Sequence, residues 1–395
     1  MILAHVADLH ITDRQGPGCL TLDEQVEHLT WIGEDMFDTD VIVVAGDIFD
    51  GLSTPRERNA AIEVFTSWAS RDSVIVVRGN HDRPEDLSFL RHLDTVHPIK
   101  VHDRPGFEET ISGDVIACLP WPRKAQLVAA LDGLKATEVD AAAVAGMRAI
   151  LAGIRARFEQ YTGARVILSH AELGAASMDN DQPLTGKCDI DLGAVDLLDT
   201  EADYISLGHI HKHQILESKI CYSGSTHPTA FPAVGQELRD YGYCLVEVER
   251  GEAPVIEHRK TPYREMVTIH AEWIGTELTN TGDGIEEINE LLLHDHLDLP
   301  VGSAVKLVYE APSSAREQAR EQADRSRDQL LHAGASSVII EPRITQTHRV
   351  RSETIAKAQT NRDRIESLWG ARDELPARAP EILTKLQTLE SEAQA

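Results

Sequence analysis

Five apolar runs, rich in β-branched residues, each end in side chains of the kinds that bind metals or phosphates. The runs span 2–7, 41–45, 74–77, 166–168 and 204–207, and the residues that follow them are Asp8-Leu-His10, Gly46-Asp47-Ile-Phe-Asp50, Gly79-Asn80-His81-Asp82, Ser169-His170 and Gly208-His209-Ile-His211. Such runs are typical of strands buried on both faces of a sheet. In layered α/β folds, sites form beyond the carboxyl ends of the strands. The pattern therefore predicts an α/β fold in which five strand ends converge on one site.

Taken singly, these motifs differ in how specifically they indicate a binding site. Asp-x-His and Gly-Asp after a strand are also common turns, and Ser-His alone indicates little. Gly79-Asn80-His81-Asp82 is more specific, because Asn and His side chains rarely sit together at a buried strand end without a partner. In Gly208-His209-Ile-His211 the two histidines lie two residues apart, so on an extended segment they point to the same side. The joint occurrence favours one site over five unrelated turns.

The ligand types indicate which ions such a site binds. They supply imidazole nitrogens, carboxylates and one amide oxygen, without a thiolate, which suits Mn, Fe or Zn better than Ca or Mg alone. The set is too large for one ion. Two ions about 3.5–4 Å apart that share one carboxylate use all of it, and such pairs serve in-line hydrolysis of phosphate esters.

Composition narrows the class of protein. The chain has 395 residues and a formal charge of −27, so it has room for two or three domains and does not bind nucleic acid through its net charge. A local basic patch, bound cations or a basic partner remain possible routes to DNA. Five scattered cysteines, without a Cys-x-x-Cys pair, argue against a disulfide framework and for a reducing cytoplasm. There is no apolar run of about 20 residues and no signal-like N-terminus, so we expect a cytoplasmic protein without a membrane segment.

The chain divides into three parts by pattern. Residues 1–250 alternate strand-like and helical stretches, with capping boxes at 21–24 and 54–57 and an apolar helical face over 139–161. Residues 251–345 read as a small α/β domain. It has strands near 305–309 and 338–340, and a helix that begins with a cap at 314–317 and ends at Gly334. Residues 346–395 carry two short helical patterns, at 355–369 and 382–389.

The five motifs, in this order, resemble those of the calcineurin-like metallophosphoesterases. More closely, the chain resembles the SbcD-like nucleases of the meiotic-recombination nuclease family. Residues 203–232, DYISLGHIHKHQILESKICYSGSTHPTAFP, extend the resemblance beyond the generic motifs, through GHIH-x-x-Q, YSGS and the Phe that follows. The resemblance covers about residues 1–250 well and is looser beyond them. The chain departs from the family at Ile11-Thr12-Asp13, where Leu-Gly is usual, and at Thr226-His227, where Pro is frequent.

The resemblance implies a fold and a role for each site residue. The fold is a four-layer α-β-β-α metallophosphoesterase sandwich with a small α/β capping domain and a helical C-terminal tail. One ion is expected at Asp8, His10 and His211, the other at Asn80, His170 and His209, with Asp47 bridging both. His81 is expected to act on the phosphate and the leaving oxygen, with Asp82 orienting it.

The resemblance also implies an activity and partners. The activity is Mn²⁺-dependent cleavage of DNA, as an exonuclease on duplex ends and an endonuclease on single strands and hairpins. The capping domain is expected to help place the DNA, and the tail to dock on an SbcC-like SMC-family ATPase. Helices of the nuclease domain, including the one after Thr54, are expected to pair two copies into a homodimer.

Two other functions remain open from the sequence. A phosphomonoesterase or a cyclic-nucleotide phosphodiesterase uses the same two-metal core, and fold does not fix substrate. A non-enzymatic DNA-end scaffold that recruits an ATPase is a further alternative, against which the intact ligand set argues. Among the other histidines, we expect His5 to be a core residue, and His213 and His227 to be surface or supporting residues rather than ligands.

Overall fold

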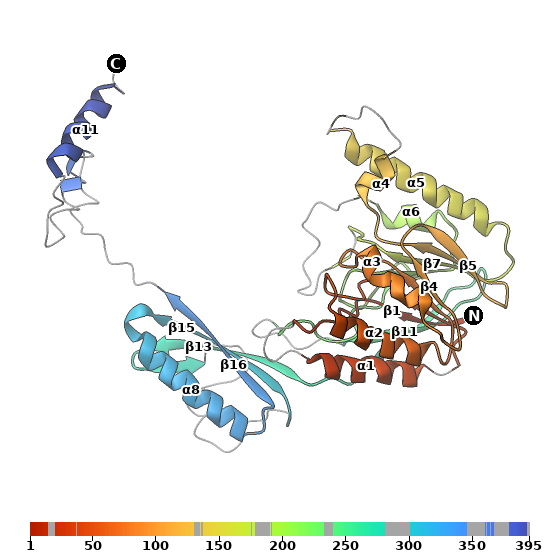
Figure 1. Ribbon diagram of the computed structural model, residues 1–395, viewed down its shortest axis with the longest axis horizontal. Helices are drawn as coiled ribbons and strands as arrows, with labels where there is room; N and C mark the ends of the chain where they lie inside the picture. Colours follow the sequence, from red (N-terminus) through yellow and green to blue (C-terminus); the bar gives the residue numbers. More distant parts are fainter. Residues whose placement is uncertain are drawn as a thin grey trace.

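Two six-stranded sheets and one four-stranded sheet make up the framework of the part of the chain that the structure describes (Figure 1). The computed structural model describes residues 1–14, 20–36, 38–129, 135, 137–174, 176–177, 190, 192–232, 240–280, 301–345, 360, 362–363, 365–366 and 379–392. Within these residues, no helix is both long enough and apolar enough to cross a membrane.

The first sheet contains the three N-terminal apolar runs. Its strand order is β12-β11-β1-β2-β3-β4. The strands are β1 (Ile2–Val6), β2 (Val41–Val44), β3 (Val74–Val77), β4 (Ile99–His102), β11 (Gly242–Glu247) and β12 (Val255–Lys260). Strands β1 to β4 run parallel, so their carboxyl ends share one edge, whereas β11 runs antiparallel to β1.

The second sheet contains the other two runs. Its order is β5-β6-β7-β8-β10-β9. The strands are β5 (Gly106–Glu109), β6 (Val115–Leu119), β7 (Arg165–His170), β8 (Tyr204–Gly208), β9 (Gln214–Leu216) and β10 (Ile220–Tyr222). Because β6, β7, β8 and β10 are parallel, the segments after β7 and β8 also leave from one edge. All five predicted strands are confirmed.

Helices cover the outer face of each sheet (Figure 1). The helices α1 (Leu22–Asp35), α2 (Pro55–Trp68) and α3 (Pro84–Leu87), with the 3₁₀ turn η1 (Ser88–His92), share an apolar cluster with the first sheet. The helices α4 (Lys124–Val128), α5 (Val139–Phe158) and α6 (Ala194–Leu198) share one with the second sheet. A third cluster, which includes Leu3, Val43, Cys118 and Leu168, joins the facing sides of the sheets. The predicted α-β-β-α layering is therefore confirmed.

The predicted helix starts in this sandwich are also present. Thr21 and Thr54 each accept a hydrogen bond from the amide three residues later and complete capping boxes with Glu24 and Glu57. The apolar face predicted over 139–161 is the buried face of α5, although the helix ends at Phe158 and leaves Tyr161 beyond it. Local capping and periodicity are sufficient to place these helices.

Within the described residues, helix α8 (Arg316–His332) packs on the four-stranded sheet. The order of this sheet is β14-β13-β15-β16, from β13 (Met266–Ile274), β14 (Glu277–Asn280), β15 (Ala304–Pro312) and β16 (Ser337–Thr345). Ala319, Ala323 and Leu330 of α8 pack on it. The predicted cap at Ser314 is wrong, because residues Ser313–Ala315 form a 3₁₀ turn, η2, and no side chain caps α8. Gly334, at φ +108, ends the helix region as predicted.

The C-terminal part contains helix α11 (Ala379–Glu392), which confirms the second helical pattern of the tail. The first pattern, 355–369, falls mostly outside the described residues. The predicted boundaries at 250 and 345 stay predictions.

Candidate active site

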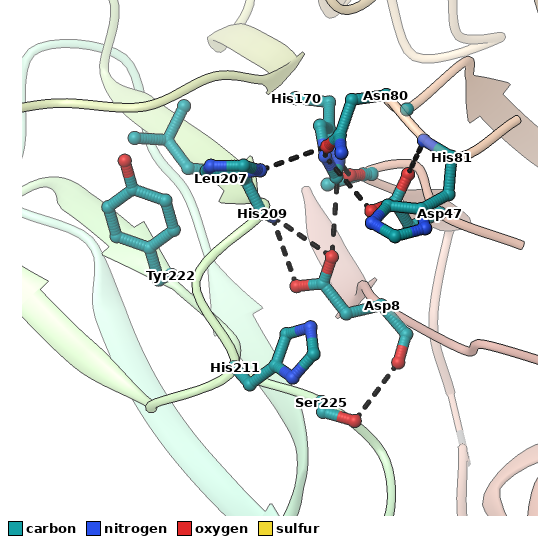
Figure 2. Close-up of polar contacts among 12 residues, drawn as sticks. Asp8, Asp47, Asn80, His81, His170, Leu207, His209, His211, Tyr222 and Ser225 are labelled. Atoms are coloured by element: carbon teal, nitrogen blue, oxygen red, sulfur yellow. Dashed lines mark hydrogen bonds and ion pairs between the residues drawn. The ribbon is translucent and has the colours of Figure 1, made fainter. Parts of the chain in front are cut away.

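All seven predicted metal ligands lie together at the carboxyl ends of five strands. Figure 2 labels all of them except His10. They are Asp8 and His10 after β1, Asp47 after β2, Asn80 after β3, His170 at the end of β7, and His209 and His211 after β8. The two sheets each contribute one edge to the site. Residues far apart in the sequence thus face one another because parallel strands align their ends.

The backbone is unusual where it carries these ligands. Of the seven non-glycine residues with positive φ in the described part of the chain, four are predicted ligands: Asp8 (+52), His10 (+43), Asp47 (+53) and His209 (+106). Positive φ is unfavourable for residues with a Cβ and gathers at functional sites. The amides of Asp8 and His10 donate to the carbonyls of Gly46 and Asp47, which holds the first two turns together.

Two glycines make room for these turns. A Cβ on Gly46, whose φ is +88, would lie 2.4 Å from His170 Nδ1. A Cβ on Gly79 would lie 2.0 Å from Asp47 Oδ1. The glycines of the Gly-Asp and Gly-Asn-His-Asp motifs are therefore required by close approach to ligand side chains.

Asp8, His10 and His211 form the first group of ligands. One ligand atom of each lies within 4.8 Å of the others. The Nε2 atoms of His10 and His211 are 2.9 Å apart. Burial lowers the pKa of His211 to about 3, so its imidazole is neutral and can offer a lone pair. Two imidazole nitrogens that face each other this closely need a proton or a cation between them.

Asn80, His170 and His209 form the second group. His170 Nδ1 lies 2.6 Å from the carbonyl of Ala45 and donates to it, which leaves Nε2 facing Asn80 Oδ1 at 2.7 Å. His209 Nδ1 lies 2.9 Å from the same oxygen. An amide oxygen carries only lone pairs on this side. The convergence of lone-pair atoms on one point is the arrangement expected around a cation.

Asp47 lies between the two groups. Its Oδ2 is 3.4 Å from His170 Nε2 and 3.9 Å from His10 Nε2. Its Oδ1 accepts a hydrogen bond from the amide of His81 at 2.9 Å. The nearby carboxylate of Asp8 is fully buried, and this burial raises its pKa to about 6. Buried carboxylates so close together call for cations, and the donor set fits two divalent ions that share Asp47.

His81 is the exposed member of the site. Its side chain is 42% exposed, while its amide is anchored to Asp47. Its Nδ1 lies 3.7 Å from Oδ1 of Asp50, which also approaches His10 Nδ1 at 3.4 Å. The contact with the His10 ring lowers the pKa of Asp50, so this carboxylate is charged. The sequence placed Asp50 in the Gly46-Asp47-Ile-Phe-Asp50 motif, but no role was predicted for it.

Asp82 does not take the position that the sequence predicts for it. Its Oδ1 accepts hydrogen bonds from the amides of Ile48 and Phe49, at 3.0 and 3.1 Å, and its Oδ2 accepts from Gly79 at 2.9 Å. The carboxylate is buried, and this burial raises its pKa to about 6. The Asp82 side chain therefore connects the turn after β2 to the turn after β3. The carboxylate beside the His81 ring is that of Asp50.

The three other histidines that the sequence analysis singled out lie outside the two ligand groups. His5 is fully buried, as predicted for a core residue, with Nδ1 2.8 Å from the Tyr204 hydroxyl and Nε2 3.1 Å from the Leu207 carbonyl. Both ring nitrogens thus have partners. His213 is half-buried and stacks on His258, with ring centroids 4.1 Å apart. His227 is fully buried and therefore is not a surface residue.

The family of the chain follows from its sequence match. Residues 1–213 match the family model of the calcineurin-like phosphoesterases. The chain belongs to this family. Because family members hydrolyse phosphate esters at a two-metal site, the ligand groups above are its candidate metal centre, and the chain is a phosphodiester-hydrolysing enzyme.

Curated relatives carry the resemblance further. The SbcD component of the nuclease SbcCD from Rhodobacter capsulatus is 27% identical over 289 residues, which cover 64% of this chain and 68% of that protein. The corresponding component from Escherichia coli K12 is 25% identical over 305 residues, covering 68% and 70%. That of Bacillus subtilis is 27% identical over 267 residues, covering 60% and 64%. The predicted resemblance to SbcD-like proteins is confirmed.

Proposed function

We propose that this chain is the nuclease component of an SbcCD-like DNA repair and recombination complex. It cuts DNA phosphodiester bonds, as an exonuclease at duplex ends and an endonuclease on single strands and hairpins. One observation carries the proposal: a two-metal ligand set converges at five strand ends, in a chain whose relatives are SbcD components of the nuclease SbcCD.

The proposed metal is Mn²⁺. Asp8, His10 and His211 would hold one ion, and Asn80, His170 and His209 the other, with Asp47 shared. Four imidazoles among seven ligands favour a transition metal over Mg²⁺ or Ca²⁺. When bound, such a pair supplies positive charge to the phosphate oxygens and lowers the pKa of a water molecule.

His81 is the residue that we assign to the leaving oxygen. In the hydrolysis a water oxygen bonds to phosphorus, the bond from phosphorus to the leaving oxygen breaks, and that oxygen takes up a proton. The exposed ring of His81 can reach a bound substrate, and the anchored amide fixes its position against Asp47. The carboxylate of Asp50, whose Oδ1 lies 3.7 Å from Nδ1 of His81, is the group that can orient this ring.

The remaining parts of the chain are assigned to substrate and partners. Residues 1–250 are the nuclease domain, 251–345 a capping domain that helps place DNA, and 346–395 the segment that docks on an SbcC-like SMC-family ATPase. Ile382 of α11 is 42% exposed, which supports a docking role for the tail. We further propose a cytoplasmic homodimer paired through helices that include α2.

The first test is cleavage of end-labelled duplex and hairpin DNA with Mn²⁺, Mg²⁺ or EDTA. We expect Mn²⁺-dependent cutting that Asp47→Ala abolishes, while Asp23→Ala, which changes an exposed carboxylate of α1, retains it. Turnover of p-nitrophenyl phosphate or cyclic AMP far above DNA cleavage, with the ATPase partner present, would instead indicate a small phosphoester substrate.

Two variants test the roles of single parts. His81→Ala should lose most of its cutting activity while both metal ions stay bound, as measured by metal analysis of the purified protein. Loss of metal would contradict its role at the leaving oxygen. Deletion of 346–395 should leave nuclease activity in place and abolish co-purification with the SbcC-like ATPase, whereas retained co-purification would refute the docking role.

A further inference from the structure

A cavity of about 380 Å³ opens beside the candidate metal centre. It lies between the turn after β4, the segment after β6, and the helices α4 and α5. Its walls are mainly apolar and include Leu119, Pro120, Trp121, Leu127 and Met147, with Arg104 and Arg123 among its polar members. A cavity of this size and lining is typical of sites that bind small ligands or parts of larger ones.

Trp121 connects this cavity to the metal centre. The same indole that lines the cavity packs against His209, with ring centroids 4.8 Å apart, and against His170 at 5.7 Å. A group bound in the cavity against this ring therefore lies next to two predicted metal ligands. This position suits the part of a substrate that adjoins the phosphate to be hydrolysed.

Buried Arg78 fixes Trp121 in place. The Trp121 amide donates to the Arg78 carbonyl at 2.8 Å, and the Arg78 guanidinium donates to the carbonyls of Trp121 and Gly79, at 2.7 and 3.0 Å. Arg78 directly precedes the turn with Asn80 and His81. The wall of the cavity and the catalytic turn are thus one rigid unit, which is what a subsite for accurate positioning requires.

The charges around the cavity favour an anionic ligand. Arg104 and Arg123 are exposed, and no ion pair is found for either within the described residues. Asp103, the one acidic residue among the described residues of the lining, is paired with Arg91 at 3.0 Å. In a chain of net charge −27, two cations beside an aromatic cavity form a local patch for phosphates.

We infer that this cavity binds the nucleobase of a nucleotide next to the scissile phosphate, stacked on Trp121, while Arg104 and Arg123 contact neighbouring phosphates. The inference rests on the proposed nuclease function. Every base has an aromatic face, so such a subsite tolerates any sequence. A base inside a duplex must first leave its stack, and therefore frayed or single-stranded ends are the preferred substrates.

A binding experiment with the metal-loaded full chain tests the inference without requiring catalysis. We expect deoxyguanosine 5′-monophosphate to bind roughly tenfold to one hundredfold more tightly than 2-deoxyribose 5-phosphate, which lacks a base, in isothermal titration calorimetry. Trp121→Leu should remove this preference. Trp121→Phe should keep most of it, and Trp31→Leu, a half-buried tryptophan of α1, should keep all of it. Equal affinities for the two ligands, or an unchanged preference in Trp121→Leu, would overturn the inference.

Cleavage of single-stranded oligonucleotides with one abasic residue, moved along the strand, tests the position of the subsite. The wild-type chain should cut markedly more slowly when the abasic residue falls at one position relative to the cut, and Trp121→Leu should lose this dependence. Cutting that is insensitive to every abasic position would overturn the inference while the proposed function stands. If the preference for the mononucleotide holds and no DNA is cut, even with the ATPase partner, the proposed function fails and base binding stands.

The two arginines have their own matched comparison. Arg104→Gln and Arg123→Gln should each raise KM for oligonucleotides and reduce its salt dependence, because each phosphate contact adds to the salt slope. Arg325→Gln, an exposed arginine of α8, makes the same change in net charge as a control. An equal effect of all three would show that net charge alone, and not this cavity, attracts the strand.

Discussion

Replacing Asp82 with Asn separates a structural role for this carboxylate from a role in orienting His81. The two carboxylate oxygens accept three backbone hydrogen bonds on two sides, from Ile48 and Phe49 on one and from Gly79 on the other. An asparagine has one acceptor oxygen, so its NH₂ group must face amide donors on one of the two sides. The substitution therefore leaves one or two buried amides without an acceptor.

The magnitude follows from that count. A buried donor left without a partner costs about 1–3 kcal/mol. Replacing the buried charge by a neutral side chain offsets part of this loss. We therefore expect the free energy of unfolding to fall by about 2–3 kcal/mol, out of a typical total of about 5–15 kcal/mol. For a domain of this size the corresponding fall in melting temperature is about 4–12 °C.

The assay is thermal unfolding followed by circular dichroism, in EDTA, so that metal binding does not contribute. Asp50→Asn is the matched control, because it makes the same chemical change at a side chain that is 52% exposed. Its melting temperature should stay within about 2 °C of that of the unsubstituted chain, as is usual for a surface substitution. Its cleavage rate should fall, since Asp50 is the carboxylate beside His81.

A double-mutant cycle on the cleavage rate decides which carboxylate supports His81. Asp50→Asn should be strongly non-additive with His81→Ala, whereas Asp82→Asn should be additive with it, at a temperature where both variants are folded. A normal melting temperature for Asp82→Asn, together with a rate loss that disappears in the His81→Ala background, would refute the structural role. It would restore the role predicted from the sequence.

Three other substitutions or treatments have expected outcomes. Gly46→Ala should reduce bound metal, measured by elemental analysis, because a Cβ would lie 2.4 Å from His170 Nδ1; full metal content would contradict the required close approach. Removal of metal with EDTA should lower the melting temperature and re-addition of Mn²⁺ should restore it, since ligands bound only by the native state stabilise it. Burial by itself would raise the pKa of Asp203. The hydrogen bonds that Asp203 accepts from Arg165 and Gly251 have the larger combined effect and lower its pKa below the ordinary value of 3.8. The ionised Asp203 therefore stabilises the fold above pH 3.8, and this contribution is lost as the pH falls further. In urea unfolding, the free energy of unfolding of Asp203→Asn should fall less steeply with acidification than that of the unsubstituted chain.

The sequence by itself determined the layers and the inventory of the site. Apolar β-branched runs such as 41–45 and 74–77 form buried strands because their periodicity and composition are local properties. Capping boxes at Thr21 and Thr54 place helices for the same reason. The chemistry of the side chains after the strands indicates metal ligands, and parallel strands bring such side chains to one edge.

Only the tertiary structure decided which side chains meet. Asp82 follows His81 directly in the sequence, but the turn directs it inward to backbone amides, and the carboxylate beside the ring is Asp50, from the preceding strand end. The contacts of Arg78 with Trp121, 43 residues apart, likewise depend on how two sheets meet face to face. Residues that are neighbours in the sequence share a backbone, but their side chains can leave it in different directions and meet different partners. The direction of each ligand and the partner of each charge are therefore fixed by long-range packing.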